Sequence, residues 1–278
     1  MGLVAQGVEF EPVFTPEALA AVRAHPGFRA AVTGLARTSV ELYSGHRLLN
    51  LVASDRGRFV TAMLVGRLHH EGRLTAASLK SLCARHGFAS PGRTSALIAL
   101  MRWAGYLTVQ GRTLIPTPRF FATQGQRVAG ELAAVGQVSP AARTVSERLP
   151  DPALLGRFLT ALTQLYESGE RLVDNAPVLE FCIERIGGFL VLNDLMLRAR
   201  ETDDILPISV SAWSRRFCIS RPHVLMVLRE AEAAGLIART EAGVEVRPAL
   251  LEALDAFFAG VIHVNARAAE EALGPAAV

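Results

Sequence analysis

Lysine and cysteine are both scarce in this chain of 278 residues. Lys80 is the only lysine beside 28 arginines, a bias that indicates a GC-rich bacterial genome more than a functional choice. The three cysteines, Cys83, Cys182 and Cys218, are widely spaced and odd in number. That pattern argues against a disulfide framework and against a zinc site, and it is typical of reduced thiols in a cytoplasm.

Long apolar runs and catalytic motifs are missing as well. No apolar run reaches the roughly 18 residues of a membrane span, and the first residues lack the basic start and apolar stretch of a secretory signal. We find no phosphate-binding glycine loop, nucleophile elbow or pair of carboxylates. His69 and His70 diverge by about 100° on a helix, so they cannot easily share one metal. We therefore expect no catalytic site, metal, cofactor or membrane association.

Half of the residues are hydrophobic, which is enough for a large core, and the net charge is only +3. That charge is distributed unevenly. Residues 55–125 hold ten basic side chains against Asp55 and Glu71, a net charge of +8, so the rest of the chain carries −5. A basic segment inside a mildly acidic protein is expected of a nucleic-acid binder, although arginines also solvate ordinary helix faces.

The stretch from 81 to 116 carries the clearest structural signals. The spacing predicts a helix, a tight turn at Gly87, a second helix capped by Ser90, a stop at Gly105 and a hairpin over 106–116. Gly87 suits the turn because only glycine adopts a positive φ at little cost. A serine before a helix and a glycine after it are common boundary residues.

This order of elements resembles the winged helix-turn-helix of bacterial transcription regulators of the MarR and related types. The alternative is an ordinary helical hairpin followed by an ordinary β-hairpin. The resemblance implies a mainly α fold with small β-hairpin wings, and a third helix that enters the major groove of double-stranded DNA. It also implies a cytoplasmic, nucleoid-associated regulator. The tandem arrangement leaves open whether a small-molecule effector acts on it.

The same signals recur in the second half of the chain, at a constant offset and without a gap. Ser90 falls on Ser220 and Gly105 on Gly235, and the apolar positions stay in phase from one half to the other. We interpret this as a tandem duplication with pseudo-two-fold symmetry, in a chain that is either a monomeric pseudo-dimer or a homodimer. The expected boundaries are 1–135 for copy 1 with its winged domain at about 55–121, 136–152 for a linker, and 153–278 for copy 2 with its winged domain at about 187–250. The end of the chain, from Ala268 onward, is expected to fray.

Copy 1 offers the stronger set of DNA contacts. Arg93, in the first turn of the third helix, is the best candidate for a base edge, because arginine binds guanine through two hydrogen bonds. Arg112 at the wing tip has little structural reason to be there, and Arg85 could meet a phosphate or form a surface salt bridge. Thr94 could equally face the core, because it falls on Val224 in the repeat. The candidate DNA contacts in copy 1 are Arg85, Ser90, Arg93, Thr94, Ser95 and Arg112, the hydroxyls being suited to phosphate.

Copy 2 keeps the structural signals but has lost much of the positive charge. Glu241 and Glu245 in its wing would oppose binding to phosphates. We therefore expect copy 1 to be the main DNA reader, and copy 2 to make a weaker contact or to serve dimerisation or regulation. The candidate DNA contacts in copy 2 are Arg215, Arg216, Arg221 and His223.

Two other functions fit the same residues. A replication-initiation or chromosome-segregation protein with tandem winged helices would share these features, and so would a module that binds other proteins. The charge of +8 in copy 1 argues against the protein-binding module. Tyr166, Phe181 and Phe189 are interpreted as core residues, with a hydrophobic pocket as the alternative.

Overall fold

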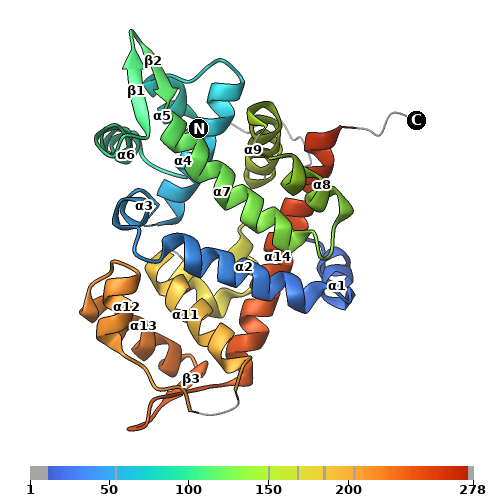
Figure 1. The fold of residues 1–278 in the computed structure, drawn as a ribbon, viewed down its shortest axis with the longest axis vertical. Coiled ribbons are helices and arrows are strands. Elements are labelled where there is room, and N and C mark those ends of the chain that lie inside the picture. Colours follow the sequence, from blue (N-terminus) through green and yellow to red (C-terminus); the bar gives the residue numbers. More distant parts are fainter. Residues whose placement is uncertain are drawn as a thin grey trace, which may run out of the picture.

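The computed structural model describes residues 12–53, 55–149, 151–167, 169–183, 186–202 and 205–274. The fold is mainly helical with two small antiparallel hairpins, which confirms the predicted fold class at that level (Figure 1). The first half contains α1 (Pro16–Ala24), α2 (Phe28–Tyr43), α3 (Arg47–Val52), α4 (Arg56–His70), α5 (Ala76–Arg85), α6 (Pro91–Trp103), β1 (Leu107–Gln110), β2 (Thr113–Pro116) and α7 (Pro118–Val135). The second half contains α8 (Pro140–Arg148), α9 (Pro152–Tyr166), the 3-10 turns η1 (Leu172–Asn175) and η2 (Pro177–Leu179), α10 (Glu180–Ile183), α11 (Ile186–Ala199), α12 (Val210–Arg216), α13 (Arg221–Ala233), β3 (Ile237–Arg239), β4 (Val244–Val246) and α14 (Pro248–Leu273).

Serine caps and glycine stops bound α6 and α13, as the sequence predicted. The hydroxyl oxygens of Ser90 and Ser220 each accept a hydrogen bond of 3.3 Å from the backbone N–H three residues further on. These caps satisfy backbone donors that the start of a helix leaves unpaired. Gly105 and Gly235 follow the two helices with φ angles of 76° and 72°, a conformation that favours glycine.

Each hairpin gains a third, very short strand. β1 pairs with β2, and β3 with β4, in antiparallel register. The chain ahead of the second helix of each unit then bridges to the returning strand: Thr75 pairs with Thr113, and Leu206 with Val244. Each bridge ties a hairpin to the segment between α4 and α5 or between α11 and α12. Sequence signals did not reveal the bridges, because a single paired residue has no periodic pattern.

The helices of the two halves interleave around a shared core. Within the halves, α2 packs along α7, and α9 packs along α14. Across the halves, α4 packs against α9 and α11 packs against α2. An ion pair adds to this contact, because the Arg67 guanidinium of α4 lies 2.5 Å from the carboxylate of Glu167, just after α9. Each half therefore completes the core of the other, and the buried apolar side chains form one cluster.

Two expectations about the connecting segments were wrong. The expected linker at 136–152 contains the helix α8, which packs against α7 and α14. Its Ala142 and Val145 are buried. The end of the chain does not fray from Ala268, because α14 continues to Leu273 and Ala268 is fully buried. Residues 275–278 of that expectation lie outside the described residues. Burial against other helices holds both segments, and composition alone does not reveal it.

Within the described part of the chain, α14 is the one helix that is long and apolar enough to cross a membrane by length and composition. Of its most apolar stretch, 50% is buried inside the fold. The helix packs against α1, α8 and α9, and its Phe258 and Ile262 belong to the core. A buried core helix passes the same test of length and composition, so the finding is weak evidence for a membrane span.

Candidate nucleic-acid interface

The helices α6 and α13 lie on one side of the molecule, and the two hairpins lie toward opposite ends of its long axis. In Figure 1 both helices are at the left edge, α6 above α13, with β1 and β2 at the top and β3 near the bottom. Each hairpin follows its helix directly along the chain. Figure 1 thus places both helices on the same side of the molecule, with one hairpin toward each end of the long axis.

The buried face of α6 includes one residue that we expected at the DNA. Thr94 is fully buried, together with Leu97, Ile98 and Met101. Its hydroxyl donates a hydrogen bond of 3.1 Å to the backbone carbonyl of Ser90. The prediction that Thr94 contacts DNA is therefore wrong. The alternative that Thr94 faces the core is confirmed, because it lies on the same helix face as the buried apolar residues.

Arg93 is exposed but already has a partner. Its side chain is 63% exposed, and its Nη2 lies 3.2 Å from Oδ1 of Asp55. Asp55 also caps α4 by accepting a hydrogen bond of 3.0 Å from the backbone N–H of Arg58. The pair thus joins the starts of α4 and α6. An exposed ion pair contributes at most about 1 kcal/mol, so a phosphate or a base could displace Asp55 at small cost.

The two predicted serine contacts are engaged within their own helix. The Ser90 oxygen caps α6, and the Ser95 hydroxyl donates a hydrogen bond of 2.9 Å to the backbone carbonyl of Pro91. Ser90 is exposed and its hydroxyl proton can still be donated outward. Ser95 is half-buried and its proton is already used. Of the two, Ser90 is the one whose geometry suits a phosphate oxygen.

Arg85 and Arg112 are exposed cations on the segments before and after α6. Arg112 sits at the tip of the first hairpin after Gly111, which has a φ of 60°. Arg85 ends α5, just before the turn to α6. Neither guanidinium has an ion-pair or hydrogen-bond partner among the residues that the structure describes. The salt bridge weighed as an alternative for Arg85 is absent from that part of the chain.

Arg216 holds the second half together and is not a free surface cation. Its Nη1 lies 2.6 Å from Oδ1 of Asp194, and its Nε donates to the hydroxyl of Ser44 over 2.9 Å. Asp194 is only 6% exposed and also accepts a hydrogen bond of 2.8 Å from the indole N–H of Trp213. The expected DNA contact of Arg216 stays a prediction, because its side chain is still 42% exposed. The sequence did not show this network because the partners lie on other elements.

The remaining cations of the second half are divided between free and paired positions. Arg215 and Arg221 are exposed and have no ion-pair partner within the described ranges, whereas His223 is half-buried. Arg239 on β3 is bound to Glu232 through two hydrogen bonds, and its Nη2 lies 2.5 Å from that carboxylate. These hydrogen bonds hold the pKa of Glu232 below its usual range. Together with Glu241 at the hairpin tip, the second half is the poorer surface for a polyanion.

Sequence reasoning overlooked one large exposed side chain at this face. Trp103, the last residue of α6, is 72% exposed, and Val109 on β1 is 44% exposed. An exposed tryptophan is uncommon outside contact surfaces. The sequence could have revealed the exposure of Trp103, because this residue does not fall on the apolar face of α6 that includes Ile98. Among the residues that the structure describes, no group of three His, Cys, Asp or Glu side chains could hold a metal ion.

Comparisons of the chain with protein-family models, with curated proteins and with solved structures gave no match.

Proposed function

We propose that the chain is a sequence-specific DNA-binding transcription regulator with tandem winged helix-turn-helix domains, in which the first domain is the main DNA reader. One observation carries this proposal: the order of three helices, a hairpin and a bridging strand occurs twice. The hydrogen bond from Tyr106 N to Met101 O has its counterpart, at the offset that relates the two copies, from Leu236 N to Ala231 O. Each hairpin also carries a bridge to the segment ahead of its second helix, and the bridge of the second copy is displaced by one residue from the position that this offset gives.

The first domain would bind DNA with the start of α6 in the major groove. Arg93 would leave Asp55 and place its two-pronged guanidinium on the O6 and N7 atoms of a guanine. Arg112 on the hairpin would reach the adjacent backbone or minor groove, and Arg85 a phosphate on the other side of the helix. Ser90 would donate its hydroxyl to a phosphate. All four of these side chains are exposed, which supports this arrangement.

The second domain would make the weaker contact. Arg215 and Arg221 can still meet phosphates, while Glu241 repels them and Arg239 is occupied by Glu232. Because α4 packs on α9 and α11 on α2, both domains are held in one body, as a homodimer would hold its two copies. The chain would then act as a monomer. Sedimentation that shows a tight dimer would count against this part of the proposal.

The proposal is tested by measuring DNA affinity against salt. Fluorescence anisotropy with fragments selected from a random DNA library should show an affinity that falls steeply with salt, because each phosphate contact releases counterions. Arg93→Ala should weaken binding by about tenfold or more and relax the preference at one base pair. Arg148→Ala is the matched control, since Arg148 is exposed on α8, at the opposite side of the molecule from α6 and α13 (Figure 1). Equal affinity of both variants and the parent chain would refute the reading of α6.

Genome-wide mapping of the bound sites distinguishes a transcription regulator from a replication initiator and from a segregation protein. A regulator occupies promoters, whereas a replication initiator occupies an origin and a segregation protein follows the chromosome axis. Binding at an origin alone would replace the transcriptional role and leave the DNA contacts intact.

A contact with another protein is a second candidate function, and the exposure of Trp103 favours it. A side chain of this size on the surface is typical of the centre of an interface. Trp103→Ala would then abolish association with the partner and leave DNA affinity within about twofold. If the variant instead loses DNA binding as strongly as Arg93→Ala, Trp103 belongs to the DNA interface.

A further inference from the structure

A cavity of about 330 Å³ lies between the two halves of the chain. Its walls come from α2, α4 and α7 of the first half and from α9, α11 and α14 of the second. The volume is within the range of about 300–1,000 Å³ that is usual for small-molecule sites. Tyr166 and Phe189, which we interpreted as core residues, both line it, so the hydrophobic pocket weighed as the alternative is present.

Most of the cavity wall is apolar and aromatic. On the side of the second half, Phe189, Phe257 and Phe258 form a cluster whose ring centroids lie 5.1–5.8 Å apart. On the side of the first half, Phe59 lies under the guanidinium of Arg127, 5.0 Å from it. Such a surface offers a flat apolar molecule contacts with several rings at once.

Four polar groups on this wall lack hydrogen-bond partners. Arg127 and Asn265 are 4% and 2% exposed, and the Nη2 of the first and the Oδ1 of the second have no partner within the described residues. The hydroxyls of Tyr43 and Tyr166 also have none within the same ranges. Burial raises the pKa of both tyrosines well above the usual range, so both hydroxyls stay protonated. Arg127 Nη2 and Asn265 Oδ1 are buried, and a buried polar atom without a partner is costly, so a bound molecule is one way to satisfy both. The tyrosine hydroxyls are further donors that such a molecule can use.

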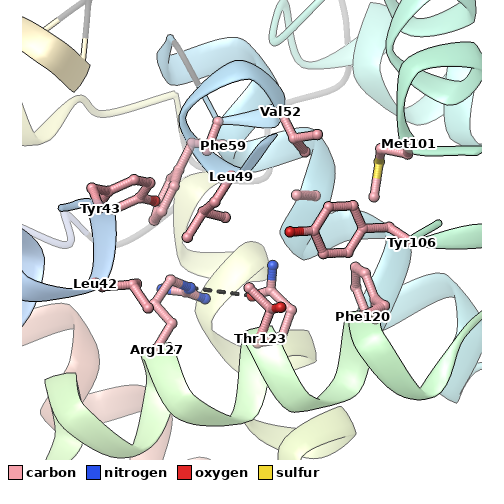
Figure 2. Close-up of a pocket in the computed structure, with 13 residues that line it drawn as sticks. Leu42, Tyr43, Leu49, Val52, Phe59, Met101, Tyr106, Phe120, Thr123 and Arg127 are labelled. Carbon is pink, nitrogen blue, oxygen red and sulfur yellow. Dashed lines mark hydrogen bonds between the residues drawn. The ribbon is translucent and has the colours of Figure 1, made fainter. Parts of the chain in front are cut away.

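Two side chains hold Arg127 in place. Its Nε donates to Oε1 of Gln124 over 3.1 Å, the dashed line beside Arg127 in Figure 2. Its Nη1 lies 2.7 Å from Oε2 of Glu131. The hollow drawn in Figure 2 is a neighbouring space of about 20 Å³ that shares Tyr43, Phe59 and Arg127 with the large cavity. The small hollow cannot hold a ligand. Of these two neighbouring spaces, only the larger cavity could be filled by one.

The charged groups around the cavity are already paired. Arg127 is matched by Glu131, Arg171 by Glu180 at 2.5 Å, and the Glu170 carboxylate accepts a hydrogen bond of 2.7 Å from Val13 N. The two remaining basic side chains also have partners: the His86 ring lies 3.8 Å from the Glu167 carboxylate, and Arg56 interacts with another residue. An ionised ligand would therefore bring an unmatched charge into a poorly solvated site, which is strongly unfavourable.

We propose that this cavity binds an uncharged, mainly apolar small molecule that carries an aromatic ring and an oxygen acceptor for the Arg127 and tyrosine donors. Both halves contribute walls, so an occupied cavity changes how the two halves pack. That change would alter the relative placement of α6 and α13 and so the affinity for DNA. The regulatory step rests on the proposed DNA binding, whereas the binding of the small molecule does not.

A matched pair of fluorescent probes tests the site in the full chain without DNA. N-phenyl-1-naphthylamine is uncharged, and 8-anilino-1-naphthalenesulfonate has the same ring system with one negative charge. We expect the uncharged probe to bind saturably with one molecule per chain, and the sulfonate to bind at least tenfold more weakly. No saturable binding, or equal or tighter binding of the sulfonate, would overturn the proposal.

Substitutions that fill or spare the cavity locate the bound probe. Ser39→Phe on α2 and Val261→Phe on α14 add a ring from either wall, and each should weaken binding at least tenfold. Ser39→Ala should leave the affinity unchanged. Ala153→Phe fills a separate cavity of about 260 Å³ that also involves His69 and Gly156, and it should have no effect. If both filling variants bind the probe like the parent chain, or if Ala153→Phe abolishes binding, the assignment is wrong. Circular dichroism identifies any variant that fails to fold. If one of the two filling variants does not fold, the probe affinity of the other tests the assignment.

The oxygen acceptor is tested with Prodan, an uncharged naphthalene that carries a ketone. Hydrogen bonding to that ketone shifts its emission to longer wavelength. Tyr166→Phe should move the emission of bound Prodan to shorter wavelength and leave the affinity for the phenylnaphthylamine within twofold. Unchanged Prodan emission in Tyr166→Phe and in Tyr43→Phe would contradict the donor role of the tyrosines. Adding the probe to the DNA titration tests only the regulatory step, so its failure is distinguishable from failure of the site.

Discussion

The two helix–hairpin units, α4 to β2 and α11 to β4, share their backbone order but place their polar groups differently. At equivalent positions the first unit buries Leu64 and Cys83, whereas the second buries Asp194 and Trp213 in a hydrogen-bonded network with Arg216. The first unit is held by apolar packing and keeps its exposed arginines unpaired at Arg85 and Arg112. The second uses an arginine to complete its interior.

The hairpin tips repeat this difference. Arg112 projects from the first tip without a partner among the described residues, whereas Glu241 stands at the second and Arg239 beside it is bound to Glu232. The number of arginines is therefore an incomplete measure of what a surface can bind. The carboxylates that lie beside each guanidinium have to be counted as well.

The largest expected effect separates the two interiors. Asp194→Ala leaves the Trp213 N–H and the Arg216 guanidinium without their acceptor, so the free energy of unfolding should fall by about 3 kcal/mol. Asp194→Asn keeps an acceptor for Trp213 and should cost less. Leu64→Ala in the first unit should lower the same free energy by about 2–5 kcal/mol through a cavity. Urea titrations measure all three, and a loss below about 1 kcal/mol for Asp194→Ala would show that the network is not structural.

The next effect separates the two hairpin tips. Arg112→Glu should lower DNA affinity about tenfold at about 0.1 M salt and reduce the salt dependence, because a phosphate contact is lost and a repulsion is added. Glu241→Arg should raise affinity by about threefold or less. Anisotropy titrations at several salt concentrations give both values. A larger effect at 241 than at 112 would make the second unit the main reader.

A smaller effect concerns two histidines, one in each half. Burial lowers the pKa of His69 on α4 and of His263 on α14 below the ordinary value of about 6.5. At acidic pH the unfolded chain then binds more protons than the folded one. The free energy of unfolding is therefore highest above about pH 6.5 and falls as the pH drops through that value. His263→Gln should flatten this dependence more than His69→Gln, because His263 is the more buried. Unfolding measured at pH 5 and pH 7.5 tests the order, and an equal effect would contradict it.

The smallest effect comes from freeing a cation in the weaker unit. Glu232→Gln releases Arg239 from its ion pair, and we expect DNA affinity to rise by less than about twofold. Glu245→Gln, which removes a neighbouring charge without releasing an arginine, is the matched control. A rise of tenfold in Glu232→Gln would mean that the second hairpin already lies against the DNA.

Local signals were enough to predict the helix and hairpin boundaries. Ser90 and Ser220 cap helices, and Gly105 and Gly235 end them, through bonds that span a few residues of the same segment. The constant offset between the two copies followed from these same signals. They also placed Arg85 and Arg112 correctly on the surface.

The sequence did not reveal partners that are distant along the chain. Arg216 contacts Ser44 from the other half of the chain, and Arg93 of α6 contacts Asp55 just before α4. Thr94 was ambiguous because a small hydroxyl side chain suits either a core or a phosphate. The sequence did not reveal the cavity between the halves, because its walls come from elements of both halves and no single segment carries a pattern for empty space.

The interleaving of the halves has a consequence for biosynthesis. When the ribosome has released the chain as far as the end of α7, neither α9 nor α11 has been made, and the sides of α4 and α2 that those helices cover are bare. The apolar sides of α2 and α4 can therefore be buried only after the second half of the chain has been translated. The last helix to be synthesised is α14. The half-made chain is the form most exposed to aggregation and the one for which a chaperone matters most.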